Sequence, residues 1–317
     1  MKKISLTLYS LILAFPLLFG QQEEQFTQFM HFKLGYNPAY AGSNDAPALT
    51  LLSRNQWIGL DGAPQTQAIS FNMPMANKKV GLGMNLLRQT IGISNNINGD
   101  VIYAYRMRVG RGYLSLGAQA SVRLIRMDFS KVEGTQPVDT DSAIPIGFRS
   151  KFVPNFGAGL YYQTNNLYFG FSIPRLLQNN IDLAEDQGVL SREVRHAYMM
   201  AGAIVSLGEA VDLQPQLVFK YVSGAPFDAD LNLNLVFGER LTTGLSYRLG
   251  GSRENNLGES LSLILATQIS NLAQFGLSYD FGLSQLRSYN NGTVEGFLRF
   301  YFGGKSEGGE FESPRFF

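Results

Sequence analysis

One repeated residue pattern restricts what this chain can fold into. In the stretch "YLSLGAQASVRLI", residues 113–125, apolar side chains alternate with small or polar ones. Successive side chains of a β-strand point to opposite faces of the sheet. The alternation therefore puts Leu114 and Leu116 on one face, and Ser115 and Arg123 on the other. It predicts a strand with one apolar and one polar face.

The same alternation recurs in fourteen segments, and each segment ends at a turn. Alternation over this length is typical of strands rather than helices. The strands are expected at 48–56, 65–75, 80–91, 99–109, 113–127, 154–163, 167–173, 196–207, 211–222, 229–237, 241–249, 257–269, 272–283 and 293–302.

The connections between these segments alternate between short and long. The short ones include "GRG", "TNN" and "GER", and the longer ones include "WIGLDGAP", "GISNNIN" and the spans 128–153 and 174–195. An even number of antiparallel strands, with tight turns at one end and longer loops at the other, is typical of an outer-membrane β-barrel. A closed barrel pairs every backbone group inside the lipid and leaves no open edge.

We therefore predict an all-β fold, a single 14-stranded antiparallel transmembrane β-barrel over residues 48–303 in the outer membrane. The low charged fraction of 16% agrees with it, since soluble domains usually contain about 25%. A soluble β-sandwich or propeller is the alternative. It does not explain the loop asymmetry and the export signal together.

That export signal occupies the first twenty residues. Lys2 and Lys3 precede a mostly apolar stretch from Ile4 to Phe19, and Gly20 precedes the polar run "QQEEQ". This order predicts a signal peptide at 1–20, cleaved near Gly20. A retained anchor helix is the alternative, although a spanning helix needs about 20 apolar residues.

Residues 21–47 are expected to form an N-terminal periplasmic or lumenal segment. Its stretch "NPAYAGS" contains the breaks Asn-Pro and Gly-Ser. Fourteen strands enclose more space than the eight whose interior side chains alone can fill. We expect Asn37, Pro38 and Tyr40 to fold into the lumen, or over its periplasmic mouth, as a plug. A simple lead-in turn is the alternative.

Both chain ends are expected in the periplasm, beside the short turns. The tail at 304–317 begins Gly-rich and ends in "PRFF". We expect it to be periplasmic, where it either docks on a partner or remains a free end.

Charged residues of both signs fall on the polar faces of the strands. A charge is tolerated in a hydrated lumen and costly against lipid. We expect ion-paired packing of the lumen wall; a ring that selects a solute is the sharper alternative. The candidates are Asp100, Arg106, Arg123, Arg248, Glu295 and Arg299.

Three longer connections carry candidate partner contacts. "RNQWIGLDGAP" holds the single tryptophan, Trp57, between Arg54 and Asp61. The alternative places Trp57 in the interfacial aromatic girdle and Arg54 in the lumen wall. The spans 128–153 and 174–195 are long enough to be functional. Their candidate contacts are Arg149, Arg175 and Arg192.

Several function classes are disfavoured. The chain has no Cys, which excludes disulfides and thiolate sites. Its net charge of +1, without a basic block, argues against nucleic-acid binding. "DTD" at 139–141 lacks the spacing of an EF-hand, so no metal or cofactor is predicted. His31 and His196 lie outside any catalytic motif, so no enzyme is predicted.

Four stretches together resemble the PorP/SprF family. They are "QFTQFMHFKLGYNPAYAGS", "LTLLSRNQWIGLDGAPQTQAISFNMPM", "FSIPRLL" at 171–177 and "SPRFF" at 313–317. The resemblance implies an outer-membrane protein of the type IX secretion system, in bacteria that secrete surface proteins and often glide. It implies as partners a large secreted cargo, often an adhesin, and other secretion components including periplasmic lipoproteins.

The expected function is therefore non-enzymatic. The barrel would dock the C-terminal domain of its secreted cargo and support export or anchoring at the cell surface. A channel of the fatty-acid transporter type, for small hydrophobic molecules, is the alternative. It predicts an apolar lumen pocket and a lateral opening. A purely structural membrane anchor is the third possibility.

Overall fold

The computed structural model describes residues 23–132, 147–183, 191–226, 228–250 and 258–302. The predicted signal peptide at 1–20, the "DTD" at 139–141 and the tail at 304–317 lie outside these ranges. None of the helices in the described ranges is long and apolar enough to cross a bilayer. These helices are η1 (Phe29–His31), α2 (Lys33–Tyr36), η2 (Pro38–Tyr40), η3 (Phe129–Lys131) and η5 (Gln285–Ser288).

Fifteen strand segments form one antiparallel sheet. They are β1 (Ala48–Asn55), β2 (Gln65–Met75), β3 (Val80–Ile91), β4 (Ser94–Val109), β5 (Gly112–Asp128), β6 (Phe148–Gln163), β7 (Leu167–Ile173), β8 (His196–Ala203), β9 (Val205–Ser206), β10 (Val211–Val222), β11 (Asp228–Phe237), β12 (Leu241–Leu249), β13 (Ser260–Ser270), β14 (Ala273–Gly282) and β15 (Thr293–Tyr301).

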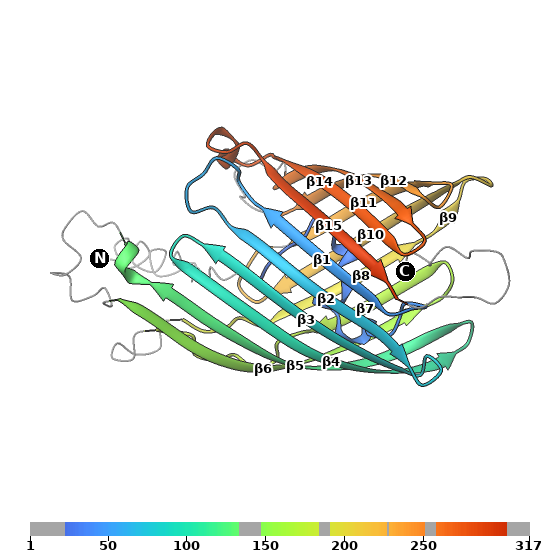
Figure 1. Cartoon of the computed structure of the whole chain (residues 1–317), viewed down its shortest axis with the longest axis horizontal. Coiled ribbons are helices and arrows are strands. Elements are labelled where there is room, and N and C mark those ends of the chain that lie inside the picture. Colours follow the sequence, from blue (N-terminus) through green and yellow to red (C-terminus); the bar gives the residue numbers. More distant parts are fainter. Residues whose placement is uncertain (1–22, 133–146, 184–190, 227, 251–257, 303–317) are drawn as a thin grey trace, which may run out of the picture.

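The sheet closes on itself, as the tilted strands in Figure 1 show. β1 pairs with β2 on one side and with β15 on the other, from Ala48↔Tyr301 to Asn55↔Val294. β8 and β9 both pair with β10 and are two parts of one strand interrupted at Ile204. The predicted closed barrel of fourteen antiparallel strands is confirmed.

Two strands begin well before the predicted residue. The expected loop "GISNNIN" belongs mostly to β4, which joins β3 through Gly92 and Ile93. Gly92 permits this tight turn because its φ is 52°. β6 likewise starts at Phe148 rather than at residue 154. A transmembrane strand needs only about 9–11 residues, whereas β4 and β6 each have 16. The extra residues need no lipid-facing pattern, so alternation did not reveal them.

The wall is apolar outside and polar inside. On β11, Leu231 and Leu233 are 45% and 48% exposed, whereas Asn232 and Asn234 are 4% and 2% exposed. This arrangement inverts that of a soluble sheet, whose apolar residues are buried. It matches a barrel whose outer face contacts lipid.

Residues 23–47, here called the lumenal segment, run inside the barrel along its length. At one end Glu23 bonds to Arg123 of β5 and to Arg175, which follows β7. Both arginines lie toward the long connections. At the other end the Phe302 N–H donates to the Pro47 carbonyl (2.8 Å), beside the short turns.

The first described residue therefore lies near the end of the barrel with the long loops. The expectation that both chain ends lie in the periplasm stays a prediction, because residues 1–22 and 303–317 lie outside the described ranges. Hydrogen bonds and ion pairs join the lumenal segment to the wall from Glu23 to Gly42, so the wall holds it along the barrel. That it blocks passage as a plug stays a prediction.

The "NPAYAGS" stretch fits closely against the wall. The Asn37 side chain accepts a hydrogen bond from the Ala39 N–H (2.9 Å) and donates to the Leu160 carbonyl of β6 (3.0 Å). A Cβ on Gly117 of β5 would lie 2.2 Å from the Ala39 nitrogen. The glycine thus allows the two backbones to approach.

Candidate functional site

Arg54 forms the centre of a buried ion cluster in the lumen. Its guanidinium lies 2.8 Å from Asp280 of β14 and 2.8 Å from Glu295 of β15. Glu295 also accepts hydrogen bonds from the backbone N–H groups of Thr27 (3.0 Å) and Gln28 (2.8 Å). Arg54 and Glu295 are 2% and 0% exposed. The cluster therefore ties three strands to the lumenal segment.

This geometry places Arg54 in the lumen wall and not on an exposed loop, and its contact with a partner stays a prediction. Arg54 occupies a lumen-facing position of β1, so its guanidinium points into the lumen. There it pairs with Asp280 and Glu295. The alternative placement, in the lumen wall, describes what is observed.

The other predicted lumen arginines also point inward. Arg248 makes a bidentate contact with Asp230 at 2.7 and 3.0 Å. Arg299 donates to Thr50 (3.0 Å) and to the His31 carbonyl, and Arg106 donates to the Gly42 carbonyl. The predicted lumenal residues Asn37, Pro38 and Tyr40 are buried among them.

A second cluster holds the outer end of the lumenal segment. Glu23 lies 2.6 Å from Arg123 and also bonds to Arg175, while Arg123 lies 3.4 Å from Glu193. Burial alone would raise the pKa of Glu23, but the two guanidinium groups outweigh burial and hold it well below its ordinary value. Glu23 is therefore an anionic anchor.

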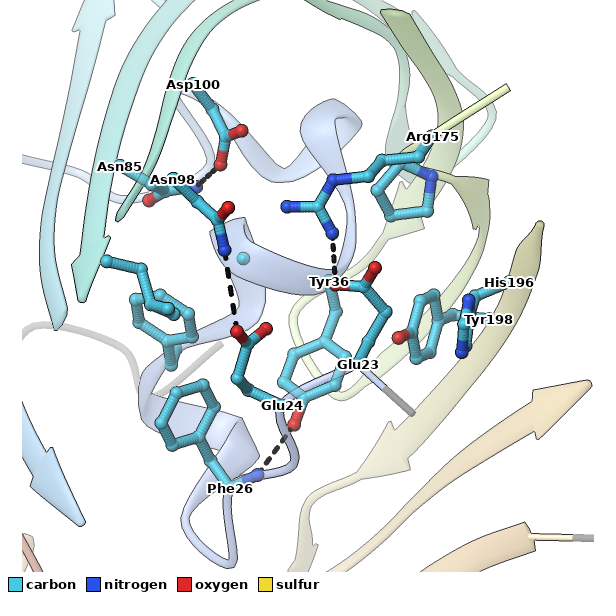
Figure 2. Close-up of a pocket in the computed structure, with 14 residues that line it drawn as sticks. Glu23, Glu24, Phe26, Tyr36, Asn85, Asn98, Asp100, Arg175, His196 and Tyr198 are labelled. Atoms are coloured by element: carbon cyan, nitrogen blue, oxygen red, sulfur yellow. Dashed lines mark hydrogen bonds and ion pairs between the residues drawn. The ribbon is translucent and has the colours of Figure 1, made fainter. Parts of the chain in front are cut away.

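Figure 2 shows the small cavity beside this anchor, here called the Glu24 pocket. Its volume is about 50 Å³, and its polar lining consists mainly of Glu23, Glu24, Asn85, Asp100, Arg175 and His196. Burial, reinforced by the neighbouring Glu23 carboxylate, raises the pKa of Glu24. Arg175 thus serves the lumen, and the expectation of a surface partner for it is corrected.

A larger cavity opens at the long-loop end, between the β1–β2 connection and the β14–β15 connection. We call it the Trp57 pocket; its volume is about 280 Å³. Its floor includes Arg54, Arg248 and Asp280, and its rim includes Trp57, Leu286 and Arg287. The two connections pair beyond the strands, because Ile58 exchanges backbone hydrogen bonds with Gly292 (2.9 Å) and Asn291 (2.7 Å).

Trp57 has an unusual backbone conformation in this rim. Its φ is 49°, in the left-handed region that non-glycine residues rarely adopt. Its N–H donates to the Thr293 hydroxyl at 3.2 Å. Its side chain is half-buried. Such strain often accompanies a functional constraint.

The remaining predicted contacts lie apart from both pockets. Asp61, Arg149 and Arg192 are exposed residues of the long-loop end. They line neither the Glu24 pocket nor the Trp57 pocket.

Sequence reasoning missed the acidic partners of the arginines. Asp230 and Asp280 lie on the polar face of their strands, so the alternation contained the signal. Glu23 and Thr27 precede the first strand, so the alternation along the strands makes no prediction about their contacts. Only the structure shows that this segment returns to the wall.

Several solved structures are similar to this chain at low sequence identity. The channel for monoaromatic hydrocarbons CymD matches with a TM-score of 0.50 at 13% identity, over 90% of this chain and 96% of that chain. Omp33 of Acinetobacter baumannii matches with a TM-score of 0.48 at 8% identity, over 82% and 100%. A FadL homologue of Pseudomonas aeruginosa matches with 0.46 at 11% identity, over 84% and 93%. At such identity the likeness to CymD shows the barrel fold alone.

The family comparison is more specific. Among curated proteins, none matches this sequence. The family model described as type IX secretion system membrane protein PorP/SprF matches residues 18–300, which includes all described strands but the end of β15. The chain therefore belongs to the PorP/SprF family of type IX secretion system membrane proteins, as an outer-membrane β-barrel.

Proposed function

We propose that this barrel docks a large secreted protein by its C-terminal domain, and that docking supports export of that protein or its anchoring on the cell surface. Membership of a secretion family supports a role for secreted cargo. The observation that carries the proposal is the Trp57 pocket, which opens where the long connections meet. Binding requires no chemical step, so the role is non-enzymatic.

The Trp57 pocket has the composition of a binding hot spot. Trp and Arg are enriched among the residues that dominate binding energy, and such residues lie in well-packed, desolvated pockets near the centre of an interface. Here Trp57 and Arg287 form the rim, and Leu286, 42% exposed, adds apolar surface. The floor is preorganised, because Arg54 and Arg248 are already fixed by buried carboxylates. A partner would bind it with little loss of side-chain freedom.

The two ends of the barrel suit different partners in this proposal. Exposed Asp61, Arg149 and Arg192 extend the cargo surface around the long-loop end. The opposite end, with the short turns, faces the periplasm and other secretion components, including lipoproteins.

The test compares rim variants in cells. Trp57→Ala and Arg287→Ala should each reduce the cargo retained at the surface by about tenfold, which corresponds to about 1.4 kcal/mol of binding. Tyr289→Ala is the matched control, because Tyr289 belongs to the same loop, is 72% exposed and does not line the pocket. Surface cargo is quantified by labelling of intact cells, and barrel abundance is measured in parallel.

Deletion of the gene separates the possible outcomes. The proposal expects loss of one surface protein while general secretion continues. Normal cargo levels in both rim variants, with normal barrel abundance, contradict docking at the Trp57 pocket. Crosslinking from Asp61, Arg149 and Arg192 should capture the same large secreted protein.

A channel for hydrophobic molecules is the second candidate, because the wall has an apolar hollow. The hollow measures about 860 Å³ and is lined by residues of β6, β7, β8, β10, β11, β12 and β13, among them the exposed Phe169, Leu233, Leu245 and Leu261. It lies on the lipid-facing side, whereas the lumen contains the lumenal segment. Saturable binding of a fatty acid to purified barrel, lost on Leu233→Gln, favours the channel; its absence favours docking.

A further inference from the structure

We propose that the outer face of β3, β4 and β5 binds a phosphorylated glycolipid of the outer leaflet, with Arg88 and Arg126 contacting its phosphate. The three strands lie side by side in the wall (Figure 1). This site is separate from the docking role proposed above, because it faces the surrounding lipid.

Both arginines occupy lipid-facing positions of their strands. On β3, Met84 and Leu86 are 50% and 46% exposed, and Arg88 follows two residues later on the same face. On β5, Arg126 follows Leu124 at the same spacing. The β3–β4 and β4–β5 registers run without a shift, so the alternation of faces holds up to these positions.

The apolar band of the outer wall gives way to polar residues on β1 to β5 as these strands approach the long-loop end. The polar outward residues lie directly opposite one another in two rows, which are Ser53, Gln67 and Arg88, and Thr90, Asn95 and Arg126. A charged side chain facing lipid is costly at the centre of the bilayer and much less so near its interfaces. The two rows therefore mark the outer interface, where lipid headgroups lie.

Asn95 of β4 brings the two guanidinium groups together. Nε of Arg88 donates to Oδ1 of Asn95 at 3.3 Å. Arg126 lies directly opposite Asn95 in the β4–β5 pair, and the Cβ atoms of such partners are about 4.5–5.5 Å apart. Since the Asn95 oxygen accepts from Arg88, its amide nitrogen is a further donor beside both arginines.

The positive charge of this group is not neutralised within the described ranges. Neither Arg88 nor Arg126 forms an ion pair there. Asp128 is the next outward residue of β5, but it lies 3.5 Å from Lys131 and accepts from Ser130. The site therefore has room for an anionic ligand.

A phosphate group matches these donors. The guanidinium group binds phosphate through two parallel N–H donors, which gives a strong and directional contact. Elsewhere the outer wall is different near the long-loop end: β10, β12 and β14 carry Tyr221, Tyr247 and Tyr279 at outward positions. Tyrosines there are typical of the aromatic girdle of a barrel, so the arginine pair distinguishes one side of the described wall.

The level of the site in the membrane favours a lipid over a protein. The long loops of such barrels are extracellular, so the headgroups beside Arg88 belong to the outer leaflet, where glycolipids carry the phosphates. Acyl chains of the same molecule would contact Val101, 69% exposed, and Phe152, 63% exposed and diagonal to Arg126 on β6. An acidic protein would first have to displace these lipids.

The test measures binding of lipid A to the purified barrel. Diphosphorylated lipid A is titrated in detergent, and the bound lipid is counted by native mass spectrometry. Arg88→Gln/Arg126→Gln should weaken binding at least tenfold, which corresponds to about 1.4 kcal/mol. The matched control is Arg108→Gln/Arg111→Gln, which removes two exposed guanidinium groups at the short-turn end and should bind as the native barrel does.

Two further ligands need no variant. Lipid A without its phosphates should bind the native barrel at least tenfold more weakly, and phosphatidylglycerol should also bind more weakly than lipid A. Equal binding with and without the phosphates, or equal binding to the native barrel and to Arg88→Gln/Arg126→Gln, overturns the proposal. Equal binding of phosphatidylglycerol overturns the choice of a glycolipid. If the double variant loses surface cargo in cells but still binds lipid A normally, the arginines contact a protein instead.

Discussion

The two halves of the lumenal segment are held by different interactions. Residues 23–31 are anchored by charged groups: Glu23 to Arg123 and Arg175, and Thr27 and Gln28 to the Arg54 cluster. Residues 37–43 are held mainly by close packing, together with hydrogen bonds from the Asn37 side chain to the Leu160 carbonyl and from Arg106 to the Gly42 carbonyl. Their backbone lies against wall glycines, and Tyr40 packs edge-on against Tyr161 with ring centroids 5.4 Å apart.

Because of this difference, the two halves should respond to different changes in the protein and its solvent. Buried ion pairs depend on the protonation of both partners and on the presence of both charges. Close packing depends on volume and hardly on pH. The outer half should therefore be sensitive to charge and pH, and the inner half to added atoms.

Removal of the Arg54 charge should have the largest effect. Arg54→Met leaves Asp280 and Glu295 buried without a cation, and breaking a buried pair in this way costs about 3–5 kcal/mol. The free energy of unfolding is measured by urea titration of the barrel in detergent. The Thr27–Gln28 region should also become accessible to hydrogen exchange.

A compensating variant separates charge from packing. Arg54→Met/Asp280→Asn/Glu295→Gln removes both orphaned charges and should regain most of the lost stability. An Arg54→Met protein within about 1 kcal/mol of the native one, the range of exposed pairs, contradicts the role assigned to the cluster.

Glu23 should make the outer anchor sensitive to acid. Its pKa is lowered by Arg123 and Arg175 despite burial, so the folded state favours its charged form. Its contribution to stability is therefore fully present above the unfolded pKa of about 4.5, declines as pH falls below that value, and is gone only once pH has fallen through the much lower folded-state pKa. Hydrogen exchange over residues 23–31 should begin to rise as pH falls below about 4.5 and should go on rising below pH 3.

Glu23→Gln is the matched variant for this pH dependence. It should lose about 1.5–3 kcal/mol at neutral pH, the range for hydrogen bonds to charged groups, and show a flatter acid profile. The inner residues 37–43 serve as the internal reference. If both halves loosen at the same pH, the two halves act as one unit and the distinction between them fails.

A single methyl group should test the inner half. In Gly117→Ala the new Cβ would meet the Ala39 nitrogen at 2.2 Å, a backbone atom that side-chain rotation cannot move. Overpacking of this kind costs about 1–3 kcal/mol. Gly99→Ala is the matched control, because a Cβ at Gly99 meets nothing within 4 Å. Equal urea midpoints for the two variants would show that the segment is not seated against β5.

The barrel itself followed from the sequence because alternation is a local property. Each strand shows which side faces lipid, and Leu231 to Asn234 illustrate both faces. The strand ends were harder to predict. The first residues of β4, from Ser94 to Asn98, extend past the length that a membrane requires, and their polar sequence resembles a loop.

The site was less predictable because it depends on pairs that are far apart in the sequence. The alternation of side chains along the strands predicted that Arg248, Glu295 and Arg299 face the lumen, as the structure shows. It did not reveal that Arg54 meets Glu295, a partner 241 residues away. Nor did it predict that Glu23, which precedes the first strand, pairs with Arg123 and Arg175.

The exposed pair at the inner end should show the smallest effect. Lys78, in the turn between β2 and β3, lies 2.6 Å from Asp45 of the lumenal segment. Their side chains are 50% and 55% exposed. Exposed pairs contribute about 0–1 kcal/mol because water and salt screen them. Lys78→Gln, which retains side-chain length, should leave the urea midpoint nearly unchanged, with little dependence on salt. A loss comparable to that of Arg54→Met would mean that this exposed ion pair also secures the inner end, beyond the packing and hydrogen bonds that hold residues 37–43.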